Sequence, residues 1–240
     1  MIEVIPAIIP KSFEDLNEHL ELVAGLVPLV QIDINDGKFT PYKSWPYIKS
    51  PDPDFVKIIR EDEGFPYWEE LEFEFHFMVV DPQAYVQEWI SAGARRIIVQ
   101  YESFANGEEV RSFAEKFQKE FGKGGGMIGT ELGIALDMKT DISVLDSIFE
   151  KFDYVQLMGI DHDGAQGSVF DEKVLDKVIA LRSAFHDLPI SVDGGVTMGN
   201  AASLIGAGAT RLVIGSAIFQ SDDIPETIEE FESLGNDNEV

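Results

Sequence analysis

The chain has 240 residues, 45% of them hydrophobic, so it is long enough to bury one sizeable core. Its 44 acidic residues outnumber 18 basic ones and give a net charge of −26, which excludes nucleic acid and an anionic membrane surface as partners. Cysteine is absent, which excludes disulfides and thiolate metal sites.

Strand-like and helix-like segments alternate from one end of the chain to the other. Residues 3–9 are apolar and β-branched, as in a buried strand, and Ser12 then begins a helix with acidic residues in its first turn. The same alternation continues to the end of the chain. The predicted strands cover residues 3–9, 28–34, 71–79, 96–101, 131–136, 154–160, 189–193 and 211–214. The later predicted helices cover residues 55–60, 81–92, 107–121, 140–149, 171–185, 198–205 and 224–234.

Eight strand–helix units predict a parallel sheet covered by helices, in one domain over residues 1–240. The count of eight favours a (β/α)₈ TIM barrel over an open doubly wound sheet. No G-x-G-x-x-G follows the first strand, so we expect no nucleotide cofactor. Residues 40–70 form an enlarged region, either a cap over the barrel mouth or a decorated surface loop. Residues 235–240 are predicted to be a frayed acidic tail.

The chain carries no targeting or membrane signal that we recognise. No apolar run reaches the roughly 18 residues of a membrane helix. The N-terminal segment lacks the basic region and small-residue cleavage site of a signal peptide. We therefore expect a cytoplasmic protein with no membrane partner.

Two aspartates end strands that lie far apart in the chain, Asp33 in the second strand and Asp193 in the seventh. Catalytic groups of barrels sit at the carboxyl ends of the strands, so these carboxylates can face each other across the mouth. Opposed carboxylates can remove a proton from one face of a carbon and return one to the other face. A lone Asp at a strand end can equally be a turn or N-cap residue.

His76 lies in the third predicted strand between Phe75 and Phe77. It could share a divalent metal with the two carboxylates, and such an ion would stabilise an enediolate oxygen as a Lewis acid. The alternative interpretation is a core histidine whose hydrogen bonds are satisfied.

Glycines follow the sixth, seventh and eighth predicted strands. They let backbone N–H groups approach an anion closely, and a helix N-terminus can add to such a site. Three successive turns of this kind favour a bound phosphate group. The candidate residues are Gly164, Gly167, Gly194, Gly195, Gly215 and Ser216.

Six segments, in order, resemble those of the ribulose-phosphate 3-epimerase family. Residues 6–9 (PAII) resemble its opening Pro-Ser-Ile-Leu, and residues 33–41 (DINDGKFTP) resemble Asp-Val-Met-Asp-Gly-x-Phe-x-Pro. Residues 76–79 (HFMV) resemble its His-Leu-Met-Val. The other matching segments are residues 164–170, 192–196 and 215–219.

The resemblance implies an isomerase that inverts C3 of a ketose phosphate, converting D-ribulose 5-phosphate to D-xylulose 5-phosphate through an enediolate. It implies that Asp33 and Asp193 are the acid–base pair and, with His76, three of four ligands of a zinc, iron, manganese or cobalt ion. It also implies that Met78 and Met158 line the reacting centre, and that the chain forms a homo-oligomer.

Three departures from the family pattern lie in this site. Gln31 replaces the fourth ligand, a His, and a neutral amide is a weaker ligand than imidazole for these metals. Ala7 replaces a Ser that contacts substrate, and Asn35 replaces a third Met. These changes motivate a second hypothesis, a barrel that binds a sugar phosphate without epimerising it. A third is another enzyme that shares only the phosphate site.

Overall fold

The structure is a computed structural model that describes residues 2–123, 129–160 and 169–235. Eight parallel strands form a closed barrel in sequence order, and β8 pairs with β1. This confirms the (β/α)₈ prediction and excludes the open sheet. The strands are β1 (Glu3–Ile8), β2 (Leu29–Asn35), β3 (Glu72–Met78), β4 (Arg96–Gln100), β5 (Glu131–Leu136), β6 (Tyr154–Met158), β7 (Ile190–Asp193) and β8 (Arg211–Ile214).

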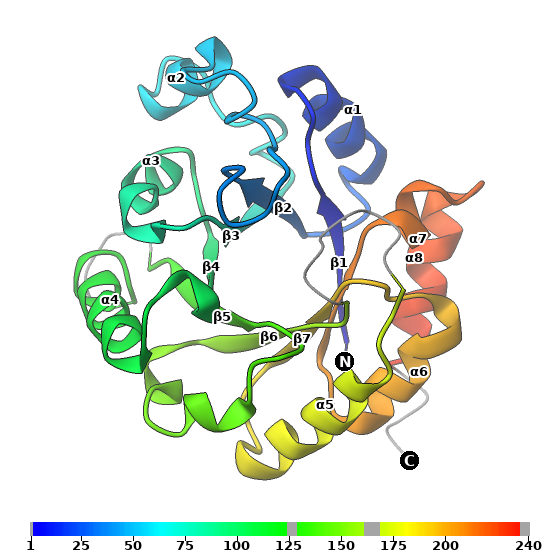
Figure 1. The fold of residues 1–240 in the computed structure, drawn as a ribbon. Coiled ribbons are helices and arrows are strands. Elements are labelled where there is room, and N and C mark those ends of the chain that lie inside the picture. The colour runs from blue at the N-terminus through cyan, green and yellow to red at the C-terminus, as the bar shows by residue number, and fades with distance from the viewer. Residues whose placement is uncertain (1, 124–128, 161–168, 236–240) are drawn as a thin grey trace.

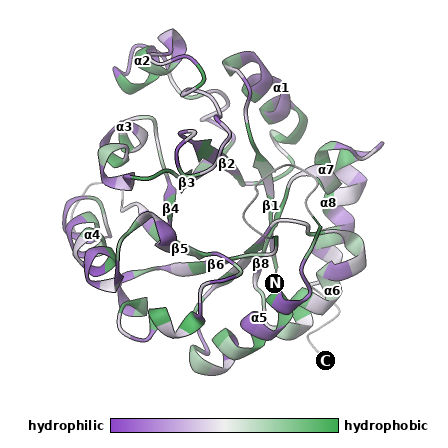
Figure 2. Cartoon of the chain, viewed as in Figure 1, coloured by the Kyte–Doolittle hydropathy of each residue, from purple (hydrophilic) through white to green (hydrophobic). Residues whose placement is uncertain are grey.

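Helices form a ring outside the barrel (Figure 1). Both hydrophobic and hydrophilic residues lie along them (Figure 2), because one face of each packs on the strands. In α1, Ser12 caps the first turn by accepting a hydrogen bond from the Asp15 N–H, and Leu16 and Leu20 are buried. The α-helices are α1 (Phe13–Val23), α2 (Pro53–Ile59), α3 (Val86–Ser91), α4 (Gly107–Glu120), α5 (Lys173–Ala184), α6 (Met198–Ala207), α7 (Ser216–Phe219) and α8 (Ile224–Ser233).

Two predicted helices were wrong in type or extent. Residues 140–149 form only short 3₁₀ turns, η3 (Ile142–Leu145) and the start of η4 (Phe149–Lys151), with bonds from i to i+3 such as Val144 N–H to Asp141 O. Residues 81–92 divide into η1 (Pro82–Ala84) and α3. A further 3₁₀ turn, η2 (Tyr101–Ser103), follows β4.

The enlarged region over residues 40–70 adds several buried side chains to the core, although more of its residues are exposed than buried. Trp45 is only 2% exposed, and its ring lies 5.5 Å from Phe13, 5.5 Å from Phe55 and 6.3 Å from Trp89. The region therefore packs against α1 and α3, which excludes a purely decorative surface loop. The acidic tail, apart from Gly235, lies outside the described residues.

Charged side chains close the N-terminal end of the barrel. Arg211 forms ion pairs with Glu3 and with the buried Glu74, and its guanidinium lies 4.1 Å from the centroid of the Tyr154 ring. Arg96 joins the same network through Glu3 at 3.0 Å. The network links several strands at the end of the barrel opposite to the one where barrel enzymes carry out their chemistry, so it serves the fold.

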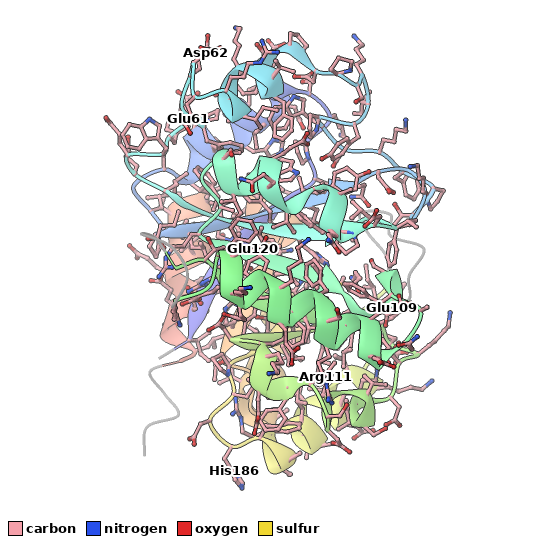
Figure 3. The ribbon with its side chains drawn as sticks, turned by 90° about the vertical axis from the view of Figure 1, so that its left-hand side faces the viewer. Glu61, Asp62, Glu109, Arg111, Glu120 and His186 are labelled. Atoms are coloured by element: carbon pink, nitrogen blue, oxygen red, sulfur yellow. The ribbon has the colours of Figure 1, made fainter. Side chains whose placement is uncertain are left out.

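Other acidic side chains lie on the outer surface, among them Glu61, Asp62, Glu109 and Glu120 (Figure 3). His186 is also exposed there. Among the described residues, no helix is both long and apolar enough to cross a membrane.

Candidate active site

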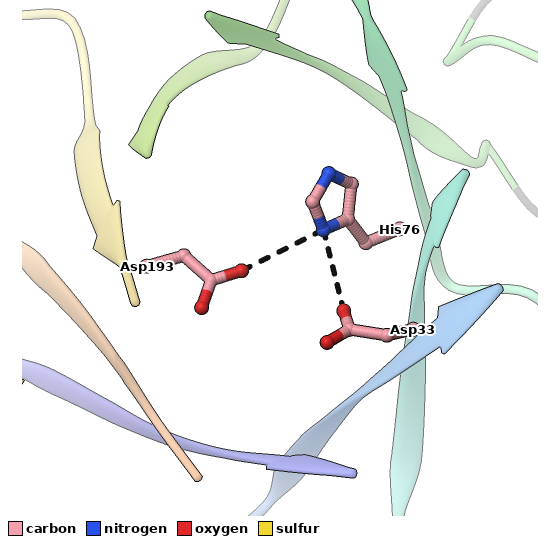
Figure 4. A group of neighbouring side chains, drawn as sticks. All are labelled: Asp33, His76 and Asp193. Atoms are coloured by element: carbon pink, nitrogen blue, oxygen red, sulfur yellow. Dashed lines mark hydrogen bonds and ion pairs between the residues drawn. The ribbon is translucent and has the colours of Figure 1, made fainter. Parts of the chain in front are cut away.

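The parallel strand register gathers the predicted chemical groups at the carboxyl end of the barrel. Asp33 on β2 pairs with His76 on β3, and Met158 on β6 pairs with Asp193 on β7. Figure 4 shows Asp33, His76 and Asp193 pointing toward one another inside the barrel. The two aspartates therefore contact other interior side chains instead of capping a turn or helix, and His76 is a buried histidine with a hydrogen-bond partner at each ring nitrogen.

One cluster joins these three side chains. His76 Nδ1 lies 3.3 Å from Asp33 Oδ1 and 3.5 Å from Asp193 Oδ2. His76 is fully buried, and the two aspartates are 6% and 8% exposed. Among the described residues, Asp33 Oδ2 and Asp193 Oδ1 have no hydrogen-bond partner, so one oxygen of each carboxylate remains available.

Gln31 links the two carboxylates through a single amide. Its Nε2 donates to Asp33 Oδ1 and to Asp193 Oδ2, each at 2.8 Å. The side chain is fully buried, and among the described residues its Oε1 has no hydrogen-bond partner. Gln31 thus lies where its sequence position placed it, beside the metal-ligand candidates, but with its nitrogen toward them.

Burial and mutual charge shift the ionisation of this cluster. Burial raises the pKa of Asp33, hydrogen bonds from His76 and Gln31 oppose the rise, and the negative charge of Asp193 adds to it. Burial acts to lower the pKa of His76, but hydrogen bonds to Asp193 and Asp33, together with their charges, raise it to about 9. The cluster therefore favours a shared proton when no cation is bound.

Two further interior glutamines belong to the site, and sequence reasoning missed them. The amide of Gln100 on β4 lies 2.9 Å from His76 Nε2, and Gln156 on β6 donates to Asp193 Oδ2 at 2.9 Å. Both are fully buried. The available signal was the period of two: Gln156 precedes Met158 on the same face of its strand.

The residues present fit a divalent metal ion. One ligand atom from each of Asp33, His76 and Asp193 lies within 4.8 Å of the others. A histidine that binds a metal through Nδ1 donates its other ring N–H to an acceptor; Gln100 lies at that nitrogen, with its Nε2 at 2.9 Å, and its Oε1, which has no hydrogen-bond partner among the described residues, would supply the acceptor after a turn of the amide. A fourth, neutral donor is available in the Oε1 of Gln31, which no described residue contacts by a hydrogen bond.

Slightly exposed side chains surround the cluster at the barrel mouth. Ala7, Asn35, Met78 and Met158 are between 4% and 8% exposed. The hydroxyl of Thr40 donates to Asn35 Oδ1 at 2.8 Å, so the amide of Asn35 is fixed with Nδ2 on its other side. Thr40 and Ser44 thus contact Asn35 at the carboxyl end of β2.

The late-strand glycines form tight turns beside the cluster. Gly194 and Gly195 have φ values of 99° and 69°, a backbone that side chains rarely adopt. A Cβ on Gly194 would lie 2.8 Å from Ile160 Cγ1. Gly215 precedes the four-residue α7 and Ser216 is its first residue, while Gly164 and Gly167 lie outside the described residues.

Solved structures share this fold at low sequence identity. A 3-hexulose-6-phosphate synthase from Salmonella typhimurium superposes with a TM-score of 0.68 at 13% identity, covering 98% of this chain and 99% of that one. KGPDC from Streptococcus mutans gives a TM-score of 0.69 at 10% identity, covering 100% and 99%. These similarities show the fold alone.

Sequence comparison identifies the family. Ribulose-phosphate 3-epimerase of Bacillus subtilis (strain 168) is 28% identical over 236 residues, 96% of this chain and 98% of the relative. The enzyme of that name from Synechocystis sp. is 30% identical over 95% of this chain and 91% of the relative. The model of the ribulose-phosphate 3 epimerase family matches residues 3–219. The chain therefore belongs to the ribulose-phosphate 3 epimerase family.

Proposed function

We propose that the protein interconverts D-ribulose 5-phosphate and D-xylulose 5-phosphate by epimerisation at C3. The observation that carries this proposal is the pair of buried carboxylates at the mouth, Asp33 and Asp193, joined through Gln31 at 2.8 Å each. Relatives named ribulose-phosphate 3-epimerase support the same reaction.

Inversion at C3 needs a base on one face of the carbon and an acid on the other. Asp33 and Asp193 come from β2 and β7, and each keeps one carboxylate oxygen without a hydrogen bond among the described residues. In one direction the first carboxylate removes the C3 proton and the second delivers a proton to the opposite face. The reverse reaction exchanges these roles.

Asp33, His76 and Asp193 would hold a divalent ion, with Gln31 as a weaker fourth ligand. Zinc, iron, manganese and cobalt all suit this nitrogen and oxygen ligand set. When bound, the ion supplies positive charge that stabilises the enediolate. The protein's own contribution is to hold both carboxylates beside C3 and to exclude water from the buried cluster.

The substrate phosphate would bind at the turns after the late strands. Backbone N–H groups near Gly194, Gly195, Gly215 and Ser216 would be its donors, since a phosphate can be held by backbone N–H groups without Lys or Arg. Gly164 and Gly167 would complete this cradle. The sugar chain would then contact Ala7, Asn35, Met78 and Met158 between the phosphate and the carboxylates.

An epimerase assay with ribulose 5-phosphate tests the proposal, run after chelation and again with zinc, iron, manganese or cobalt. We expect turnover that rises with one or more of these metals. No turnover under any condition would reject the epimerase and favour the second candidate, a barrel that binds a sugar phosphate without reaction. Gln31 in place of an imidazole ligand is the observation that favours that candidate.

A further inference from the structure

A single buried amide lies between the two carboxylates, and its orientation follows from their charge. A carbonyl oxygen facing Asp33 and Asp193 would be repelled by both, whereas the N–H groups of Gln31 Nε2 donate to both. This leaves Gln31 Oε1 buried without a partner among the described residues. The Nε2 donor of Gln31 therefore has its hydrogen bonds, whereas its Oε1 acceptor has none among the described residues.

The distances in the cluster separate two kinds of contact. A tetrahedral ion with bonds of about 2.1 Å holds its ligand atoms about 3.4 Å apart. His76 Nδ1 already lies at 3.3 Å from Asp33 and 3.5 Å from Asp193. The amide nitrogen of Gln31, at 2.8 Å from each carboxylate, lies instead at hydrogen-bond distance. The histidine therefore has the spacing of an ion's ligand from each carboxylate, the ligand atoms of all three side chains lie within 4.8 Å of one another, and the Gln31 amide lies closer to the carboxylates than a fellow ligand would.

We infer that the side-chain amide of Gln31 has two orientations: in one it donates hydrogen bonds to both carboxylates, and in the other it binds the metal ion through Oε1. This inference rests on the metal site of the proposed function. Without the ion, Nε2 bridges Asp33 and Asp193. With the ion, the amide turns by half a rotation about its terminal bond, and Oε1 becomes a ligand. The terminal torsion of Gln is broad, so this turn requires no backbone movement.

This exchange leaves the carboxylates compensated in both states. The amide donors oppose their mutual repulsion when the ion is absent, and the ion replaces the donors when it binds. To bind, the metal ion must therefore replace the two hydrogen bonds from Gln31 Nε2 to the carboxylates. The amide bridge holds the two carboxylates in place without metal.

Gln156 also contacts a carboxylate, and its Oε1, like that of Gln31, is buried without a hydrogen-bond partner among the described residues. What differs is that its Nε2 reaches only one carboxylate, Asp193 at 2.9 Å, together with His76 Nδ1 at 3.4 Å. Its hydrogen bond can remain when an ion joins the two aspartates and the histidine. Among the described glutamines, the amide that bridges both carboxylates is that of Gln31.

Nuclear magnetic resonance of the ¹⁵N-labelled full-length protein tests this inference through the side-chain NH₂ signals of three interior glutamines. Gln31→Met, Gln100→Met and Gln156→Met assign the signals one at a time. In the metal-free protein we expect the Gln31 NH₂ protons to exchange slowly with solvent and to resonate downfield. On saturation with zinc, the Gln31 signals should shift most and lose their carboxylate hydrogen bonds.

Zinc binding is measured separately by competition with a chromophoric chelator. If zinc binds and the Gln31 signals do not change, the inference is overturned while the epimerase proposal stands. The same holds if the signals show that the Gln156 amide turns instead of the Gln31 amide. If zinc does not bind, the inference fails together with the metal site, while the epimerase assay judges the reaction by itself. If Gln31→Met does not fold, the Gln31 signals are assigned in the unchanged, ¹³C,¹⁵N-labelled protein by correlating the side-chain amide with its own backbone.

Discussion

Thr40 donates a hydrogen bond to Asn35 Oδ1 at 2.8 Å, and both side chains are buried at the barrel mouth. This bond fixes the orientation of the Asn35 amide, because Oδ1 must face the Thr40 hydroxyl. The Nδ2 group, which has no hydrogen-bond partner among the described residues, remains as a donor for a substrate oxygen. Thr40 is thus a positioning residue for the proposed reaction.

Thr40→Val keeps the shape of the side chain but removes the hydroxyl donor. We expect KM for ribulose 5-phosphate to rise about fivefold, because one oriented hydrogen bond contributes about 1 kcal/mol, while kcat changes less than about twofold. Thr40→Ser retains the hydroxyl and should restore KM. A KM of Thr40→Val equal to that of the unchanged protein would contradict this role.

Replacing either carboxylate by its amide should abolish most of the proposed proton transfer. We expect Asp33→Asn and Asp193→Asn each to lower kcat by about 10³-fold, since each removes a group that acts as acid or base. The double variant should be little worse than either single variant, because the two groups act as a unit. Circular dichroism checks that each variant is folded; more than a tenth of the original kcat in a folded variant would refute the pair.

Gln31→His should strengthen metal binding at this cluster, because imidazole is a better ligand than a neutral amide for zinc and cobalt. We expect a dissociation constant for zinc that is lower by about tenfold or more in chelator competition. Gln100→His is the matched control, since Gln100 is an interior glutamine whose amide contacts His76 at the nitrogen that faces away from the carboxylates. If Gln31→His and Gln100→His increase the affinity for zinc equally, the ion does not bind between Gln31 and the two carboxylates.

Glu131, at the N-terminal end of the barrel, predicts a pH-dependent contribution to stability. Burial acts to raise its pKa, but the charges of Arg96, at 2.9 Å, and Lys123, at 3.3 Å, lower it overall. Because the folded pKa is the lower one, the stabilisation is fully present above the unfolded pKa and is lost as pH falls through the folded pKa. It should therefore begin to decline near the unfolded pKa of about 4.3 and be lost at still lower pH.

Glu131→Gln measures this contribution by urea unfolding. We expect the variant to be less stable at about pH 7, by about 1 kcal/mol or less because these groups are partly solvated, and to match the unchanged protein near about pH 3. A stability difference that does not depend on pH would assign the loss to packing rather than charge.

The sequence alone supported the barrel because period-two strands and helical repeats alternate eight times. It also located Asp33, His76 and Asp193, since strand ends of a barrel converge. The short turns over residues 140–149 were not predictable in the same way, because local apolar spacing cannot separate one turn of 3₁₀ from a helix. The amide contacts of Gln100 and Gln156 depend on which strands face each other, a property of the closed ring.

The charged network at the foot of the barrel ties together Glu3, Glu74 and Arg211 from β1, β3 and β8, far from the mouth. Side chains at the mouth can therefore be exchanged without removing the groups that fasten these strands. Residues at the barrel mouth can thus change while the ion pairs at the N-terminal end keep the strands together. Barrels of this build can accordingly be redirected to a new substrate through a few replacements around the rim.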